Sequence, residues 1–175
     1  MKKLILVNNM KNTTFFKSAL LAGGLMFVQT FSFAQQVVPA ITIKDLQKML
    51  NKETDSTLIV NFFATWCKPC VHELPLLAQM MVDSSNTKYK FVFVSCDNPD
   101  NREKKVTKFA KKKKIAGSTY LLLDSSNNYW MQAIDRRWQG SIPATLVYNQ
   151  KLKKKAFFEC EMLLEDLQGL LKKVK

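Results

Sequence analysis

The feature that most constrains the fold is a pair of cysteines, Cys67 and Cys70, placed between an apolar run and a helical pattern. The run at 57–63 reads Thr-Leu-Ile-Val-Asn-Phe-Phe and predicts a central strand, apolar on both faces except at Asn61. A helix is predicted over 67–81, so the cysteines open it. Positions i and i+3 at a helix start lie on one face, and two sulfurs placed there can close a small disulfide ring or separate as thiols. This context makes the spacing a specific signal.

The rest of the chain alternates short apolar runs with amphipathic helical patterns, which is typical of an α/β domain around a central sheet. Its length allows one domain with one hydrophobic core. Trp130, Ile134 and Trp138 are spaced four apart, which favours packing over a cofactor site. The predicted strands are 40–43, 57–63, 91–94, 119–123, 144–149 and 154–158, and the predicted helices are 44–50, 67–81, 101–112 and 161–174.

The strong positive charge does not by itself indicate nucleic-acid binding. Residues 1–34 hold 4 of the 27 basic residues and no acid, and the other 23 basic and 14 acidic residues leave a charge of +9. Lysines cluster at 111–114 and 151–155 without the interleaved aromatic residues that stack on bases. A solvated surface, able to steer acidic proteins or anionic membranes, is therefore favoured over a nucleic-acid site.

The first 34 residues have the three parts of a secretory signal peptide. A basic start at Met10 precedes an apolar run at 18–28 and the small-x-small pattern that ends at Ala34. We expect a signal peptide over 1–34, cleaved after Ala34, and export to the periplasm. The alternative is an uncleaved anchor that keeps the domain on the periplasmic side, although the run is shorter than the ~20 residues of a usual span.

The helix start gives the two cysteines different roles. Unpaired backbone N–H groups there, together with the ammonium of Lys68, stabilise a thiolate on Cys67, whose pKa we expect below the free value of about 8.5. Cys67 is therefore the predicted nucleophile and the exposed member of the pair. Cys70, the more buried one, resolves the mixed disulfide that Cys67 forms. Pro69 fits because N–H groups of a first helical turn have no acceptor within the helix.

Two other readings of the pair stay open. A purely structural disulfide is possible in an exported protein, but so small a ring stabilises the fold weakly. A metal site would need further ligands, and the one histidine, His72, projects away from the cysteines on a helix. We therefore expect no metal and no cofactor.

Two stretches resemble the thioredoxin superfamily, and specifically its exported TlpA/ResA-like branch. The first, at 59–75, reads Ile-Val-Asn-Phe-Phe-Ala-Thr-Trp-Cys-Lys-Pro-Cys-Val-His-Glu-Leu-Pro, and the second, at 138–148, reads Trp-Gln-Gly-Ser-Ile-Pro-Ala-Thr-Leu-Val-Tyr. The likeness extends from about residue 41 to the C-terminus. It implies that 35–175 form a thioredoxin-like domain: an α/β fold with a central mixed β-sheet flanked by helices, and with an inserted helix and strand. It also implies CXXC disulfide exchange, commonly in the reducing direction.

The resemblance also implies roles for residues that bind the client protein. Pro143 matches the cis-proline beside the disulfide, and the backbone of Ile142 would pair with an extended client segment. Trp66 would shield the disulfide and shape the partner surface. The alternatives are an ordinary trans proline at 143 and simple packing for Trp66. Pro75 matches a proline that kinks the helix.

Glu73 matches a glutamate that this branch carries three residues after the second cysteine. From that position it could exchange a proton with Cys70 as the resolving thiol ionises. The alternative is a surface glutamate near a helix N-terminus. Asn61 stands where cytoplasmic thioredoxins have a buried acid, so that residue's proton relay is not carried over. Lys68 replaces the glycine of general thioredoxins and favours a narrower client range.

The sequence thus predicts a thiol-disulfide oxidoreductase that reduces disulfides of exported proteins through a mixed disulfide. We expect a monomer that takes electrons from a membrane or periplasmic donor and binds no nucleic acid. A dithiol oxidant or isomerase is the nearest alternative, followed by a non-catalytic binding module. A peroxide-reducing enzyme is disfavoured because the pattern Pro-x-x-x-Thr-x-x-Cys is absent. Cys96 and Cys160 are expected to be separate buried thiols.

Overall fold

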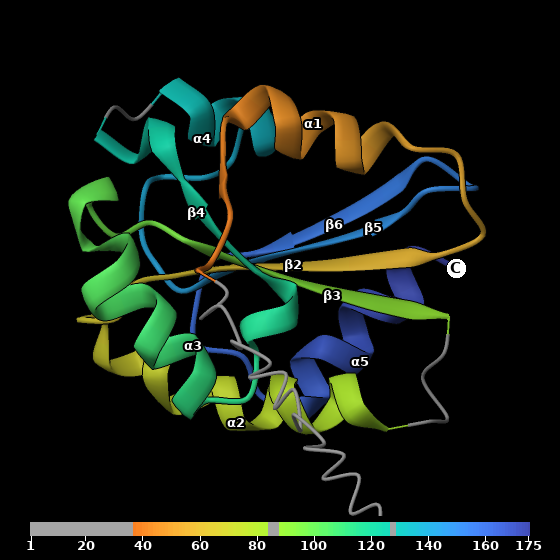
Figure 1. Cartoon of the computed structure of the whole chain (residues 1–175). Helices are drawn as coiled ribbons and strands as arrows, with labels where there is room; N and C mark the ends of the chain where they lie inside the picture. Colours follow the sequence, from red (N-terminus) through yellow and green to blue (C-terminus); the bar gives the residue numbers. More distant parts are fainter. Residues whose placement is uncertain (1–36, 84–87, 127–128) are drawn as a thin grey trace, which may run out of the picture. The chain divides into compact units, whose positions relative to one another are not determined.

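The computed structural model describes residues 37–83, 88–126 and 129–175, so the signal peptide predicted over 1–34 lies outside the described residues (Figure 1). A six-stranded sheet in the order β1-β4-β3-β2-β5-β6 forms the centre. The adjacent strands β1, β4, β3 and β2 run parallel to one another, whereas β5 is antiparallel to both β2 and β6. The predicted mixed sheet is therefore confirmed. The strands are β1 (Ala40–Ile41), β2 (Thr57–Phe63), β3 (Tyr89–Ser95), β4 (Thr119–Leu122), β5 (Ala144–Asn149) and β6 (Lys154–Phe158).

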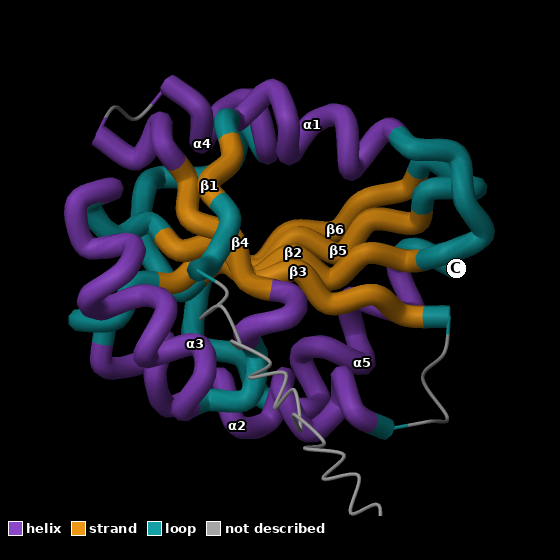
Figure 2. The backbone as a smooth tube through the Cα atoms, viewed as in Figure 1, coloured by secondary structure: helices purple, strands orange, loops and turns teal. Residues whose placement is uncertain are grey.

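Helices cover both faces of this sheet, as Figures 1 and 2 show. Two of them, α1 and α4, lie on one face, and α2, α3 and α5 lie on the other. Within the described part of the chain, no helix is long and apolar enough to span a membrane. The helices are α1 (Ile43–Asn51), α2 (Lys68–Val82), α3 (Lys108–Lys112), α4 (Tyr129–Ile134) and α5 (Leu164–Lys173).

The side chains of β2 alternate between two buried cores. Ile59 and Phe63 pack with residues of α2, α3 and α5, whereas Phe62 packs in the core under α1 and α4. Asn61 shares the side of Ile59 and Phe63 because side chains alternate along a strand. The one polar residue of this strand interior therefore faces α2, the helix that carries the cysteines.

The aromatic residues predicted to pack do so in the core under α1 and α4. The rings of Trp130 and Trp138 lie 4.9 Å apart, edge to face, and Trp138 lies 4.7 Å from Phe62. All three side chains are buried. Such contacts are favourable beyond their buried area, so this cluster holds the first residue of the second signature stretch, Trp138, in place.

The segment predicted as one helix over 101–112 is helical but not regular. It runs through a 3₁₀ turn (Pro99–Asn101), a π-helix (Arg102–Thr107) and α3. The hydroxyl of Thr107 donates to the carbonyl of Arg102 at 2.8 Å, five residues earlier, and accepts from the amide of Val38 at 3.1 Å. These two bonds tie the end of the wider turn to its start and to the chain before β1, and an apolar periodicity does not predict such a turn.

Two predictions near the C-terminus are wrong. The last helix was predicted over 161–174, but α5 begins at Leu164, and Leu163 is exposed at its cap. The amide of Leu163 donates to the carboxylate of Asp166 at 3.0 Å. Cys160 is also exposed, because it lies in the bend after β6 and not in a strand.

Candidate active site

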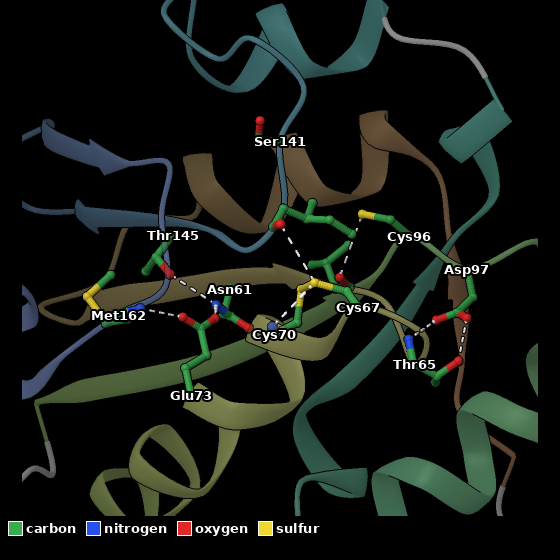
Figure 3. The surroundings of a disulfide bond; sticks show 12 residues. Asn61, Thr65, Cys67, Cys70, Glu73, Cys96, Asp97, Ser141, Thr145 and Met162 are labelled. Atoms are coloured by element: carbon green, nitrogen blue, oxygen red, sulfur yellow. Dashed lines mark hydrogen bonds between the residues drawn. A yellow bond between two sulfur atoms is a disulfide. The ribbon is translucent and has the colours of Figure 1, made fainter.

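Cys67 and Cys70 form a disulfide where β2 passes into α2, as Figure 3 shows. Cys67 is the N-cap of α2, and its sulfur accepts a hydrogen bond of 3.3 Å from the amide of Cys70. A side-chain oxygen usually takes that place at a helix start. The sulfur is therefore held where a negative charge is stabilised by the helix N-terminus.

The two sulfur-bearing residues differ in exposure in the predicted order, but the difference is small. Cys67 is 5% exposed and Cys70 is 0% exposed in the disulfide form. The Sγ of Cys67 lies 3.6 Å from the carbonyl oxygen of Ile142, which closes off one side of it. Access to Cys67 is therefore narrow.

Glu73 lies fully inside the protein, one turn of α2 after Cys70. It is 2% exposed, and its carboxylate accepts hydrogen bonds of 2.6 Å each from the side-chain amide of Asn61 and the backbone amide of Met162. Burial raises the pKa of Glu73 from 4.5 to about 7, although both hydrogen bonds oppose the rise. The surface alternative for Glu73 is therefore wrong, and this carboxyl titrates near neutral pH.

The loop before β5 brings Ile142 and Pro143 to the other side of the disulfide. Their peptide bond is cis, as the family resemblance implies, while the binding role of both residues stays a prediction. The carboxylate of Glu159 accepts hydrogen bonds from the amides of Gln139 at 3.0 Å and Ser141 at 2.7 Å. Glu159 thus holds the loop in place, a contact that the sequence did not reveal.

Asp97 holds the short segment between β2 and the first cysteine. Its buried carboxylate accepts hydrogen bonds from the amide of Thr65 at 2.9 Å and the hydroxyl of Thr65 at 2.6 Å (Figure 3). It also accepts a hydrogen bond of 2.8 Å from the hydroxyl of Ser95. Asp97 follows β3, and Thr65 follows β2. Because β2 and β3 are parallel, their carboxyl ends meet at one edge of the sheet, where α/β proteins place their sites. The sequence analysis did not select Asp97, but its position directly after a predicted parallel strand could have indicated that it lies at the site.

Trp66 and His72, the two other residues that the sequence singled out near the cysteines, both lie at the surface. Trp66 is 72% exposed next to the disulfide, so it is not packed in the core. His72 points outward, as predicted from its position two residues after Cys70, and the structure adds a contact with the carboxylate of Glu161. Among residues 37–83, 88–126 and 129–175, no group of three or more His, Cys, Asp or Glu side chains could hold a metal ion.

The other two cysteines are free thiols, so the prediction that they are separate is confirmed. Cys96 is half-buried at the end of β3, and burial raises the pKa of its thiol to about 12. A thiol with so high a pKa is almost never a thiolate at neutral pH, so it is a poor nucleophile. Cys160 is exposed, as noted above.

Comparison with known proteins agrees with this geometry. Residues 33–155 match the AhpC/TSA family. The chain is 25% identical over 141 residues to the thiol-disulfide oxidoreductase ResA of Geobacillus thermodenitrificans (strain NG80-2), an alignment that covers 78% of this chain and 75% of ResA.

Solved structures with a similar fold are related only distantly in sequence. The thioredoxin-related protein of Neisseria meningitidis serogroup B superposes with a TM-score of 0.57 at 21% identity, over 69% of this chain and 86% of that one. A secreted Mycobacterium tuberculosis disulfide oxidoreductase homologous to E. coli DsbE superposes with a TM-score of 0.50 at 20% identity, over 68% and 82% of the two chains.

The six-stranded mixed sheet between helices is a thioredoxin-like fold. Cys67 and Cys70, closing a disulfide at the start of α2, are the CXXC pair of a thiol-disulfide oxidoreductase. By its sequence match over 33–155, and consistently with this fold and this cysteine pair, the chain belongs to the AhpC/TSA family.

Proposed function

We propose that this protein reduces disulfides in other exported proteins through a mixed disulfide on Cys67. The observation that carries the proposal is the hydrogen bond of 3.3 Å from the Cys70 amide to the Cys67 sulfur at the N-cap of α2. This bond stabilises a sulfur anion more than a thiol, and only the anion attacks a disulfide. The relationship to ResA supports the same chemistry.

The reaction transfers two electrons in two exchange steps. The Cys67 thiolate attacks one sulfur of the client disulfide, so that an S–S bond forms to Cys67 and the second client sulfur leaves as a thiolate. The Cys70 thiol then loses its proton and attacks the Cys67 sulfur. The Cys67–Cys70 disulfide forms, the first client sulfur leaves, and both client thiolates take up protons. A dithiol donor in the membrane or periplasm returns the pair to its reduced form by the same exchange.

Glu73 is the residue we propose as proton acceptor for Cys70. It lies one helical turn from Cys70 in α2 and is buried as Cys70 is, and its pKa of about 7 lets it hold or release a proton near neutral pH. A base with a pKa near the working pH combines a useful unprotonated fraction with driving force for the transfer. Nearer its ordinary value of 4.5, it would be a weaker base.

The surface around the disulfide suits a protein client. Trp66 is exposed on one side, and Ile142 and Pro143 lie on the other, where the Ile142 carbonyl is 3.6 Å from the Cys67 sulfur. An extended client segment could add to the backbone there. We further propose that residues 1–34 direct export to the periplasm and are removed, that 35–175 act as a monomer, and that no cofactor takes part.

A dithiol oxidant is the second candidate, and the same hydrogen bond favours it. A more stable thiolate makes the corresponding disulfide more oxidising. Because about 30 mV corresponds to ~1.4 kcal/mol in a two-electron couple, modest electrostatics reverse the direction. The reduction potential decides: a value well above the poise of the surrounding compartment would contradict a reductase.

An insulin-reduction assay with cysteine variants tests the enzyme itself. Cys67→Ser should abolish dithiol-dependent reduction, whereas Cys160→Ser, at an exposed free cysteine, should leave the rate unchanged. Cys70→Ser should accumulate clients as mixed disulfides on Cys67. Full activity in Cys67→Ser would favour a non-catalytic thioredoxin-like binding module.

A further inference from the structure

An open groove of about 850 Å³ begins beside the disulfide and runs along the exposed side of α2. Its apolar wall is formed by Trp66, Pro69, Val71 and Pro75. Two lysines, Lys68 and Lys113, line the same groove. The groove lies on the Trp66 side of the site, and neither Ile142 nor Pro143 lines it.

Lys113 is held in this groove by a hydrogen bond to a backbone carbonyl that Pro75 leaves without its usual helical donor. Pro75 has no N–H, so it cannot donate to the carbonyl of Val71 four residues earlier in α2. The ammonium of Lys113 donates to that carbonyl at 3.4 Å and stands 5.9 Å from the centre of the Phe109 ring. A lysine held by two contacts loses less freedom on binding a ligand than one that is free in solvent.

The charge in the groove is positive on balance. Of the residues that the structure describes, Glu161 supplies the one carboxylate that lines the groove, and that carboxylate contacts His72. Among the described residues, neither Lys68 nor Lys113 forms an ion pair with a carboxylate. Further exposed lysines continue from Lys113 along and just beyond α3, at Lys108, Lys111, Lys112 and Lys114.

We propose that this groove binds the client segment next to the reacting disulfide, and that it selects segments carrying an apolar side chain beside acidic ones. The proposal rests on the reductase function above and adds the substrate class. The apolar residue would pack between Trp66 and Pro75, and an Asp or Glu of the client would approach the ammonium of Lys113. A net positive groove favours such acidic segments and disfavours basic ones, which gives selectivity and a faster encounter.

Three synthetic disulfide peptides test this, identical except for a flanking Asp-Asp, Ser-Ser or Lys-Lys pair. With the intact protein at low salt, kcat/KM should be about tenfold higher for the acidic than for the basic peptide, with Ser-Ser between them. This difference should shrink at about 1 M salt, where the screening length is only about 3 Å. Lys113→Glu should abolish or reverse the order.

Two further variants distinguish an effect of the groove from an effect of net charge and from an effect of lost structure. Lys44→Glu changes the net charge equally, but it lies exposed on α1 across the sheet and should keep the wild-type order. Lys113→Arg, which retains a cation and its donors, should also keep it. Equal reduction of all three peptides by the wild-type protein would overturn the groove proposal and leave the reductase standing. Reduction of none of them would instead refute the reductase.

Discussion

The side-chain amide of Asn61 in β2 donates a hydrogen bond of 2.6 Å to the carboxylate of Glu73 in α2, inside the core beside the disulfide. The same amide nitrogen donates to the hydroxyl of Thr145 in β5 at 3.0 Å. Because the amide of Met162 binds the other oxygen of Glu73 at 2.6 Å, this one carboxylate joins α2 to β2 and to the segment before α5. The site is therefore coupled to the fold through a group that titrates near neutral pH.

The first prediction concerns stability and pH in the disulfide form. Burial raises the pKa of Glu73 from 4.5 to about 7, so the folded protein binds this proton more tightly than the unfolded chain does. The resulting stabilisation is fully present below pH 4.5 and is lost as the pH rises through about 7. The loss amounts to about 3 kcal/mol. Glu73→Gln should lack this part of the pH dependence in denaturant unfolding.

The control for that experiment is Glu165→Gln, at an exposed glutamate in the first turn of α5. It should follow the wild-type pH profile. If Glu73→Gln and wild type lost the same free energy of unfolding between acid and neutral pH, the raised pKa of Glu73 would be wrong.

The second prediction is that Asn61→Ala raises the pKa of Glu73 further. The hydrogen bond from Asn61 lowers this pKa, so its removal leaves burial less opposed. We expect the pH-dependent loss of stability to move to higher pH, together with a general destabilisation of about 1–3 kcal/mol from unpaired buried groups. Asn51→Ala, at the exposed end of α1, is the matched control and should change neither quantity. If the pH dependence of the free energy of unfolding were the same in Asn61→Ala as in the wild-type protein, that would argue against coupling between Asn61 and Glu73.

The third prediction assigns Asp97 the positioning of the segment before Cys67. Asp97→Ala leaves the amide and hydroxyl of Thr65 without their acceptor and should cost about 2–3 kcal/mol in the free energy of unfolding. Because the backbone before Cys67 is loosened, the rate of disulfide exchange should fall even under conditions where the variant is fully folded. Asp100→Ala removes an exposed carboxylate from the same loop and should be neutral. Unchanged exchange kinetics in folded Asp97→Ala would show that Asp97 has a structural role only.

The fourth prediction concerns the loop that carries Ile142 and Pro143. Glu159→Ala removes the acceptor for the amides of Gln139 and Ser141, which lie just before it. We expect kcat/KM for a protein disulfide to fall by about tenfold through misplacement of the loop. Glu159 is half-buried and these hydrogen bonds are exposed, so the free energy of unfolding should change by less than about 1 kcal/mol. Glu53→Ala serves as the exposed control. Wild-type kinetics in Glu159→Ala would mean that the loop needs no anchor.

Local sequence patterns were enough to predict the bounds of the strands beside the cysteine pair and the start of the helix that carries it. Strand 57–63 and the hairpin at 144–149 and 154–158 have the predicted bounds, because alternation and apolar runs are properties of neighbouring residues. The start of α2 was predicted to within one residue from the cysteine spacing. The roles proposed for the two cysteines rest on the physics of helix ends and stay predictions.

Contacts between residues distant in the chain could not be predicted in the same way. Asp97 meets Thr65 across 32 positions, Lys113 meets Val71 across 42, and Met162 meets Glu73 across 89. Each depends on which strands are neighbours and on how α2 and α5 pack, which one sequence does not specify. The full burial of Glu73 likewise depends on the segment before α5, so its position three residues after Cys70 left burial and exposure both open.

The most direct test of the account is the titration of Cys67 in the reduced protein, followed by ultraviolet absorbance of the thiolate. Subtracting the titration of Cys67→Ser isolates this sulfur from Cys70, Cys96 and Cys160. The account predicts a pKa for Cys67 below the free-thiol value of about 8.5, because the helix N-terminus and the amide of Cys70 stabilise its anion. A pKa at or above about 8.5, in a pair that also fails to exchange with added disulfides, would contradict it.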